Sequence, residues 1–224
     1  VDDGAAYVHY TPNETINGVE FADIPDIGDV PLVADMSSNI FSRPMHVSRF
    51  GLIYAGAQKN CGISGLSLVI VRKALLERDG HPMTPAMLDY AAQAKARSLV
   101  ATAPTFPWYV AGLVFDWLEA EGGLDVIGVR NERKAAKLYD YIDGSNFYSN
   151  PVEPAARSRM NVPFTLADEG LNKVFLEESE QAGMVALKGH RAVGGMRASI
   201  YNAMPEAGVD TLVAFMRDFV QRHG

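Results

Sequence analysis

The sequence predicts an α/β fold, in which a mixed or parallel sheet is followed by a small α+β region from about residue 124. Short apolar runs, each ended by polar turn residues, fill the first half. Such runs are typical of strands that are buried on both faces. Two helical stretches follow, and the last third alternates strand and helix patterns, which favours a compact α+β arrangement.

Three apolar runs, at residues 30–34, 51–55 and 66–71, predict the strands of the sheet. The first run ends at Asp35, and Gly- and Ser-rich turns separate the runs. Ligands of such sheets bind at the carboxyl ends of the strands. We therefore expect the site at this edge.

The middle of the chain predicts two helices, at residues 107–121 and 124–143. Thr105 is the expected N-cap of the first helix, and the glycines at 122 and 123 are its expected stop. Apolar side chains recur on this helix at helical spacing and predict a stripe that faces the core: Val110, Leu113, Val114, Trp117 and Leu118.

The last third predicts strands at 159–164, 184–187 and 196–200 and a helix at 168–182. Apolar side chains at helical spacing predict a terminal helix: Val209, Leu212, Val213, Met216, Phe219 and Val220. We therefore expect two domains, with residues 1–123 belonging to a larger sheet domain and residues 124–224 forming a small C-terminal α+β domain.

Composition excludes several classes of protein. The 20 Lys and Arg residues against 27 Asp and Glu give a net charge of −7, and 48% of residues are hydrophobic. These values are typical of a folded protein and argue against a general nucleic-acid binder. No run approaches the roughly 20 apolar residues that span a bilayer, so no membrane association is expected.

The single cysteine, Cys61, cannot form an internal disulfide, which fits a reducing compartment such as the cytoplasm. The five histidines show no metal-ligand spacing, so no metal site is expected. The N-terminus lacks the pattern of a secretory signal and also lacks an initiator Met. We therefore expect that Val1 is not the natural start.

Lys59 and Asp35 form the first candidate site. Lys59 lies in a loop of small residues between two predicted strands, and Asp35 ends a strand 24 residues earlier. A lysine can form a Schiff base with a carbonyl, including that of pyridoxal 5'-phosphate, whose pyridine nitrogen needs an acid beside it. The alternatives are a surface lysine and an aspartate that only caps the following turn.

A second candidate site lies near the C-terminus. His190 and Arg191 precede a Gly-Gly turn, and Arg197 follows on the next predicted strand. Arginine binds carboxylate or phosphate through paired hydrogen bonds, so these residues could clamp a ligand with two anionic groups. The alternative is a set of surface charges on an edge strand.

Five segments of the chain strongly resemble the phosphoserine aminotransferase family, which belongs to the class V, fold-type I pyridoxal-phosphate enzymes. These segments are NETINGVEF (13–21), ADMSSNIFSRP (34–44), YAGAQKN (54–60), SRMNVPF (158–164) and KGHRAVGGMRASIYNAMP (188–205). The resemblance implies interconversion of phosphoserine and 3-phosphohydroxypyruvate, with glutamate and 2-oxoglutarate as the second pair, in serine biosynthesis and in many bacteria also in pyridoxine biosynthesis. It also implies a ping-pong mechanism and a homodimer with cofactor contacts across the interface.

The resemblance also implies roles for single residues. Lys59 matches the lysine that binds the cofactor covalently, and Asp35 matches the partner of the pyridine nitrogen. Thr15 and Gln58 match contacts to the cofactor ring and phosphate, and Thr102 matches a phosphate contact that reaches across the dimer. The substrate ligands would be His190 and Arg191 for phosphate and Arg197 for the α-carboxylate.

The chain departs from the family pattern in two respects. The family is about half as long again, and the missing N-terminal third carries a phosphate loop and a residue that stacks on the cofactor ring. Ala101 also stands where the family has an asparagine. Two alternatives follow: a truncated, non-catalytic dimerisation scaffold, or another class V activity such as an alanine:glyoxylate aminotransferase or a cysteine desulfurase. For Cys61, a packed thiol is the preferred interpretation.

Overall fold

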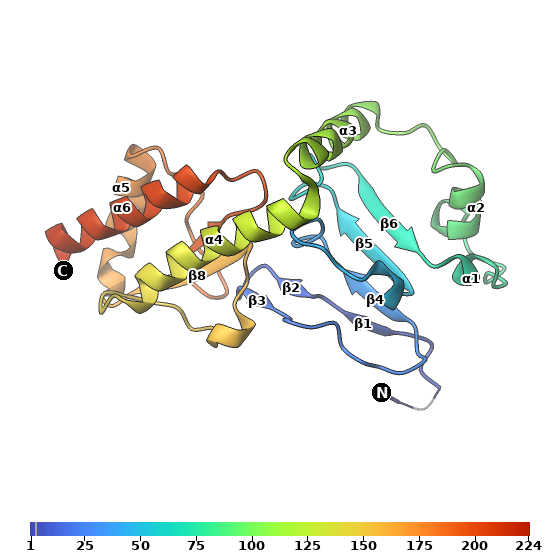
Figure 1. Ribbon diagram of the computed structural model, residues 1–224, viewed down its shortest axis with the longest axis horizontal. Coiled ribbons are helices and arrows are strands. Elements are labelled where there is room, and N and C mark those ends of the chain that lie inside the picture. Colours follow the sequence, from blue (N-terminus) through green and yellow to red (C-terminus); the bar gives the residue numbers. More distant parts are fainter. Residues whose placement is uncertain (3) are drawn as a thin grey trace.

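A four-stranded mixed sheet forms one lobe of the molecule (Figure 1). The computed structural model describes residues 1–2 and 4–224. The strands of this sheet are, in spatial order, β1 (Val8–Tyr10), β4 (Leu32–Asp35), β5 (Leu52–Gly56) and β6 (Ser67–Val71). The β1–β4 and β4–β5 pairs are parallel and the β5–β6 pair is antiparallel. The three predicted strands are thus confirmed to within two residues, and the sheet is mixed.

A short hairpin joins this lobe to the second one. Its strands are β2 (Asn13–Glu14) and β3 (Val19–Glu20). Gly18 turns the hairpin with φ +69°, and a Cβ on it would lie 2.3 Å from the Cδ atom of Pro163. Only glycine allows both this backbone conformation and this close approach to the second lobe.

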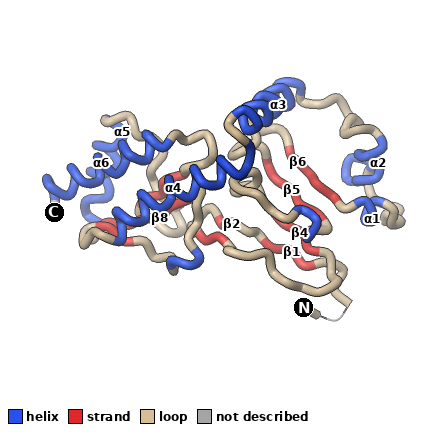
Figure 2. Tube along the Cα trace, viewed as in Figure 1, coloured by secondary structure: helices blue, strands red, loops and turns tan. Residues whose placement is uncertain are grey.

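Short helical segments and one long helix accompany the sheet, one before β5 and the others after β6 (Figure 2). The elements are η1 (Val47–Arg49) before β5, then α1 (Lys73–Leu76), η2 (Ala86–Leu88), α2 (Tyr90–Lys95) and α3 (Thr105–Ala120). The predicted N-cap is wrong by one residue, because Pro104 occupies that position and Thr105 begins the helix. The glycines at 122 and 123 both have positive φ; Gly122 lies between α3 and the next helix, and Gly123 begins that helix.

The predicted core stripe of α3 is only partly correct. Leu118 is buried, whereas Leu113 on the same stripe is 49% exposed. Ala111, which the pattern did not single out, is buried against the loop around Gly62. The described residues of this chain cover one flank of the helix, so helical spacing alone overstated its burial.

The second lobe is a three-stranded antiparallel sheet packed against three helices. Its elements are α4 (Gly123–Asp143), β7 (Tyr148–Ser149), η3 (Pro154–Ala156), β8 (Asn161–Leu166), η4 (Glu169–Leu171), α5 (Asn172–Gln181), β9 (Met196–Ser199) and α6 (Glu206–His223). The strand order is β7-β8-β9. Its core includes Phe164, Phe175, Met196 and Phe219, all at most 1% exposed.

The strand expected at 184–187 is absent, and this prediction is wrong. Ala186 has φ +60°, which breaks an extended run, and Val185 is 71% exposed. What remains is an isolated antiparallel bridge between Lys188 and Met196. It is made by Arg197 N–H to the Leu187 carbonyl at 2.7 Å and Gly189 N–H to the Gly195 carbonyl at 2.9 Å. The expected helices and the strands around 159–164 and 196–200 are present, with shifted ends.

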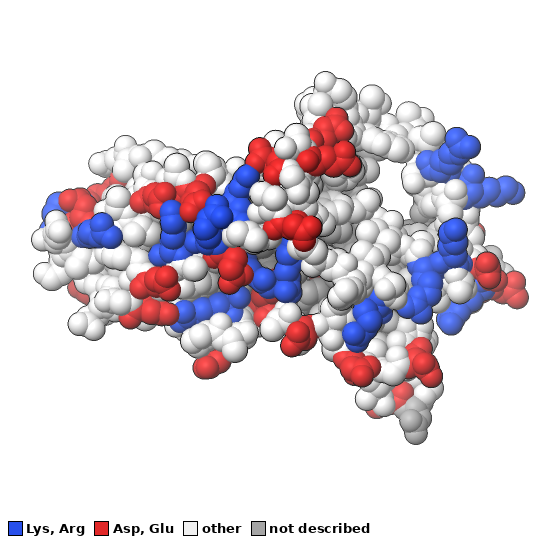
Figure 3. All heavy atoms as spheres, in the orientation of Figure 1, with Lys and Arg blue, Asp and Glu red and all other residues white. Residues whose placement is uncertain are grey.

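Charges of both signs are interspersed over the lobe that holds α4 and α6 (Figure 3). Arg133 and Lys137 of α4 both pair with Glu206 of α6, and Lys137 also pairs with Asp210. No helix in the described part of the chain is long and apolar enough to cross a bilayer.

Candidate active site

The site begins where two parallel strands end. β4 ends at Asp35, which lies opposite Tyr54 of β5. Asp35 Oδ1 accepts hydrogen bonds from the Ser37 N–H at 2.9 Å and from its hydroxyl at 2.6 Å. The same hydroxyl oxygen accepts from Gly56 N–H at 3.0 Å, so Ser37 joins the two strand ends. Asp35 is therefore fixed in place with one carboxylate oxygen already bound.

Lys59 lies in the loop that follows β5, and it is half-buried. Its Nζ donates to Thr15 Oγ1 at 2.7 Å and lies 6.0 Å from the centre of the Tyr201 ring. Burial lowers the pKa of the Lys59 amine, Asp35 opposes that shift, and Arg197 adds to it. A lowered pKa leaves more of the neutral amine, the form that attacks a carbonyl carbon.

Arg197 lies beside Lys59 and Thr15 from the other lobe. It occupies β9, and its Nη1 approaches the Thr15 carbonyl at 3.5 Å. Its Nε is buried and, among the described residues, has no hydrogen-bond partner. A buried guanidinium N–H without a partner is costly, and a carboxylate ligand would satisfy it.

His190 and Arg191 lie on a tight turn ahead of β9. The N–H groups of Val193 and Gly194 donate to the His190 carbonyl, and His190 Nδ1 accepts from Ala192 N–H at 3.2 Å. Arg191 is exposed on this turn. The structure thus groups Thr15, Lys59 and Arg197 directly, and no hydrogen bond among the described residues joins His190 or Arg191 to that group.

Two other candidates lie apart from this group. The Gln58 side chain is exposed and folds back over Gly56, where its Oε1 lies 2.6 Å from the position of an added Cβ. Thr102 is exposed in the loop between α2 and α3. The phosphate-binding roles of both residues stay predictions.

Sequence reasoning missed Tyr201 and Ser37. The Tyr201 hydroxyl accepts from Asn161 Nδ2 at 3.0 Å, and its ring faces Lys59. A signal was available, because alternate residues of a strand share a face, and Tyr201 continues the alternation of Arg197 and Ser199 just past the end of β9. Ser37 carried a weaker signal, as a hydroxyl two residues after a strand-end aspartate.

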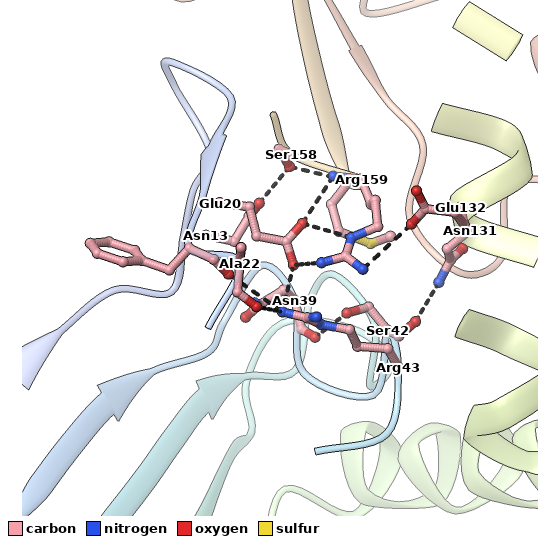
Figure 4. Close-up of polar contacts among 12 residues, drawn as sticks. Asn13, Glu20, Ala22, Asn39, Ser42, Arg43, Asn131, Glu132, Ser158 and Arg159 are labelled. Atoms are coloured by element: carbon pink, nitrogen blue, oxygen red, sulfur yellow. Dashed lines mark hydrogen bonds and ion pairs between the residues drawn. The ribbon is translucent and has the colours of Figure 1, made fainter. Parts of the chain in front are cut away.

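A polar seam joins the two lobes behind the site (Figure 4). The Glu20 carboxylate, with its side chain 2% exposed, accepts from the Arg159 backbone N–H and guanidinium, each at 3.0 Å, and Arg43 lies 3.6 Å away. Ser158 donates to Asn13 Oδ1 beside this cluster. These contacts hold the hairpin that carries Thr15 against Ser158 and Arg159, the residues just before β8.

Cys61 is buried two residues after Lys59. Burial raises the pKa of its thiol to about 11, so the thiol stays protonated at neutral pH. The interpretation of Cys61 as a packed thiol is thereby supported. Among residues 1–2 and 4–224, no group of three His, Cys, Asp or Glu side chains could hold a metal ion.

Two clefts of about 300 Å³ lie away from Lys59. One is lined by Glu20, Tyr139, Arg157 and Arg159, and the other by residues that include Tyr10, Arg43 and Phe50. The arginines of the first cleft already pair with Glu20 and Asp143. Neither cleft brings the candidate site residues together.

Comparison with known proteins supplies independent evidence. A model of the aminotransferase class-V family matches residues 1–212. A phosphoserine aminotransferase from Hahella chejuensis is 59% identical over 223 residues, which cover 100% of this chain and 62% of that protein. The chain therefore spans less than two thirds of the length of this curated relative.

Solved structures agree with this result. The phosphoserine aminotransferase from Bacillus circulans subsp. alkalophilus superposes with a TM-score of 0.97 at 49% identity, over 100% of this chain and 62% of that one. The PLP-bound phosphoserine aminotransferase from Trichomonas vaginalis gives a TM-score of 0.92 at 43% identity, over 97% and 61%. These superpositions confirm the α/β fold with a mixed sheet and a following α+β region.

Proposed function

Because the chain belongs to the class-V aminotransferase family, we propose that it performs phosphoserine:2-oxoglutarate amino transfer, with 3-phosphohydroxypyruvate and glutamate as the other pair. The observation that carries the proposal is the 59% identity, over the whole chain, to a protein named phosphoserine aminotransferase. Two contacts support it: Lys59 Nζ donates to Thr15 Oγ1, and Arg197 Nη1 approaches the Thr15 carbonyl.

We propose pyridoxal 5'-phosphate as the cofactor, as in the PLP-bound relative from Trichomonas vaginalis. The residues fit this group, since a half-buried amine with a lowered pKa lies near a fixed strand-end carboxylate. Lys59 would hold its carbonyl carbon, Asp35 its pyridine nitrogen, Thr15 its ring, and Gln58 and Thr102 its phosphate. When bound, the cofactor supplies an electron sink for the substrate α-carbon.

The protein residues would orient the substrate and move one proton. The Lys59 amine would take the proton from the substrate α-carbon and deliver it to the cofactor carbon, and a lowered pKa of this amine favours the first transfer at neutral pH. Arg197 has a buried N–H that no described residue binds, and this N–H would bind the α-carboxylate. His190 and Arg191, on the exposed turn, would bind the substrate phosphate.

The proposal also covers the domains, the cellular location with the pathways, and the oligomeric state. Residues 1–123 would belong to a large cofactor-binding domain and 124–224 would form the small domain. The protein would act in the cytoplasm as a homodimer, in serine biosynthesis and in pyridoxine biosynthesis. The exposed side chains of Phe106, Tyr109 and Leu113 on α3 are suited to contact a second copy.

The direct test is to titrate the purified chain with pyridoxal 5'-phosphate and record its near-visible spectrum. We expect a band that depends on Lys59 and is lost in Lys59→Ala. Lys73→Ala removes an exposed lysine from α1 and should keep the band. A chain that binds no cofactor at saturation, or a band that survives in Lys59→Ala, would contradict the proposal.

The phosphate role of Arg191 has its own test in enzyme that turns over. We expect Arg191→Ala to weaken the binding of phosphoserine by about 1.5–3 kcal/mol, which is the size of a lost charge-assisted hydrogen bond. The binding of glutamate should change little. Steady-state kinetics with each amino donor measure this. Equal losses for both donors would remove Arg191 from phosphate recognition.

A further inference from the structure

Lys134 is a lysine buried completely inside the small lobe. It lies in the middle of α4 and is 0% exposed. Its Nζ donates to three backbone carbonyls, those of Ile200 at 3.0 Å, Tyr201 at 2.8 Å and Met204 at 3.0 Å. An ammonium group has three N–H donors, so the turn at residues 200–204 satisfies all of them.

The charge on Lys134 is unusual because no acid balances it at close range. Among the described residues, no carboxylate lies within ion-pair distance of Lys134, and Glu206 pairs instead with Arg133 and Lys137. Burial lowers the pKa of Lys134 to about 8. An apolar side chain would avoid this desolvation cost, so the geometry assigns the lysine to holding the turn.

The same turn is bound from its other side through Asn202. The Asn202 backbone N–H donates to Asn60 Oδ1 at 3.0 Å. Its side chain accepts from Asn131 Nδ2 at 2.8 Å and donates to the Phe41 carbonyl at 2.9 Å. Asn60 is the residue directly after Lys59, so this contact ties the turn to the lysine loop.

Three consecutive carbonyls complete the connection. Those of Ile40, Phe41 and Ser42 accept from the side chains of Asn60, Asn202 and Asn131 in turn. Phe41 has φ +57°, a conformation that costs a non-glycine residue about 1–2 kcal/mol. Strain of this kind persists only where surrounding contacts fix it, as the asparagine side chains do here.

Tyr201 carries the other half of the connection. Its carbonyl is bound by Lys134, its hydroxyl accepts from Asn161, and its ring lies 6.0 Å from Lys59 Nζ. A shift of the turn would therefore move the Tyr201 ring, which lies near the Lys59 amine, and also Asn202, which binds Asn60.

We propose that Lys134 is a positioning residue for Lys59: its three bonds to the 200–204 turn hold Tyr201 and Asn202, which in turn hold the lysine loop. The proposal concerns the environment of the Lys59 amine, and it rests on the proposed function only for the use of that amine in catalysis. Lys134 itself touches none of the candidate site residues Thr15, Asp35, Lys59 and Arg197 through a hydrogen bond among the described residues.

The test measures the reactivity of the Lys59 amine without any cofactor. The purified chain is labelled with limiting acetic anhydride across pH 6–11, and mass spectrometry of the Lys59 peptide gives its labelling rate at each pH. In Lys134→Met the three carbonyls lose their donor, the turn loosens and water reaches Lys59. The pKa of Lys59 then rises towards 10.5, and we expect its labelling at pH 8 to slow at least threefold.

Lys137→Met is the matched control, because Lys137 lies on the same helix and its polar partners among the described residues are side-chain carboxylates of α6. It should leave the Lys59 profile unchanged. A folded Lys134→Met chain with the wild-type Lys59 profile would overturn the proposal, as would an equal change in Lys137→Met. If Lys134→Met does not fold, Lys134→Gln keeps two N–H donors, and we expect a smaller shift in the same direction; a wild-type profile there also overturns it.

The outcome separates this inference from the proposed function. A chain that forms no Lys59-dependent band but shows the labelling shift keeps the positioning role and loses the cofactor role. A chain that forms the band but shows no labelling shift keeps the cofactor role and loses the positioning role. In enzyme that turns over, Lys134→Met should lower kcat more than it raises the KM for glutamate.

Discussion

The two lobes differ in how completely they bury their own apolar surface. The C-terminal lobe encloses aromatic and aliphatic side chains between β8, β9 and the helices α4, α5 and α6. The sheet lobe has a smaller cluster around Leu32, Ile53 and Ala55, and it leaves Met83, Leu88 and Phe106 at least 67% exposed. The C-terminal lobe thus stabilises itself, whereas the sheet lobe presents a surface suited to further contacts.

The largest expected effect lies at the centre of the closed core. Phe175 is 0% exposed, with the rings of Phe164, Phe215 and Phe219 at 5.0–5.8 Å from its own. We expect Phe175→Ala to lower the free energy of unfolding by about 3–5 kcal/mol, because it removes a large buried ring and leaves a cavity. Urea denaturation followed by circular dichroism measures this loss. A loss below 1 kcal/mol would show that the lobe is not closed around this ring.

The next effect is a pH dependence at Lys134. Its pKa is lowered to about 8 in the folded chain, against an ordinary 10.5. Between these values the unfolded chain binds more protons, so the free energy of unfolding rises with pH, by up to about 3 kcal/mol. The measurement is the stability difference between wild type and Lys134→Met at pH 7.5 and at pH 10.5. A difference that stays constant across this window would contradict the assignment.

For Lys137, on the same helix, the contribution to stability should change with pH in the opposite direction. Asp210 and Glu206 raise the pKa of Lys137, so its contribution is present at neutral pH and is lost as pH rises through the raised value. The difference between wild type and Lys137→Met should therefore shrink at high pH. Two lysines one turn apart then distinguish a buried cation from a solvated one.

The seam between the lobes should give an intermediate loss. Glu20→Gln removes the charge that Arg159 and Arg43 share but keeps the shape of the side chain. We expect a loss of about 1.5–3 kcal/mol, since a hydrogen bond to a charged group is worth that much. Urea denaturation monitored at a probe in each lobe shows whether the lobes separate. If Glu20→Gln unfolds with the wild-type free energy, the ion pairs of Glu20 do not contribute to stability.

The smallest effect on stability is expected at the open surface. Phe106 is 67% exposed, so Phe106→Ala should change the free energy of unfolding by less than about 0.5 kcal/mol. If α3 contacts a second copy, the same change should weaken association, which sedimentation velocity over a concentration series would detect. A large loss of stability would instead show that this ring packs within its own chain.

Strand and helix identities could be predicted well because apolar patterning is a local property. The runs that became β4, β5 and β6 and the periodicity of α4 and α6 follow from the spacing of apolar residues. The failures have a common cause. Leu113 lies on an apolar stripe yet is 49% exposed, and residues 184–187 are apolar yet irregular, because spacing does not reveal which neighbours are present.

The candidate site could be predicted in part. The residue types of Asp35, Lys59 and Arg197 indicated their chemistry, and the structure brings Lys59 and Arg197 to Thr15. Tyr201 and Lys134 could not be placed from the sequence. A buried lysine looks like any surface lysine in the middle of an amphipathic helix until the turn that binds it is known.

The sequence by itself determined where the three longer strands of the first sheet and the long helices lie, and which side chains carry charge, nucleophilic amine and anion-binding chemistry. These are properties of residue type and short-range spacing. Only the tertiary structure decided that three carbonyls of residues 200–204 bind Lys134 and that Asn60, Asn131 and Asn202 meet at residues 40–42. Such contacts join residues far apart in the chain, and their energy depends on burial and direction that no local pattern encodes.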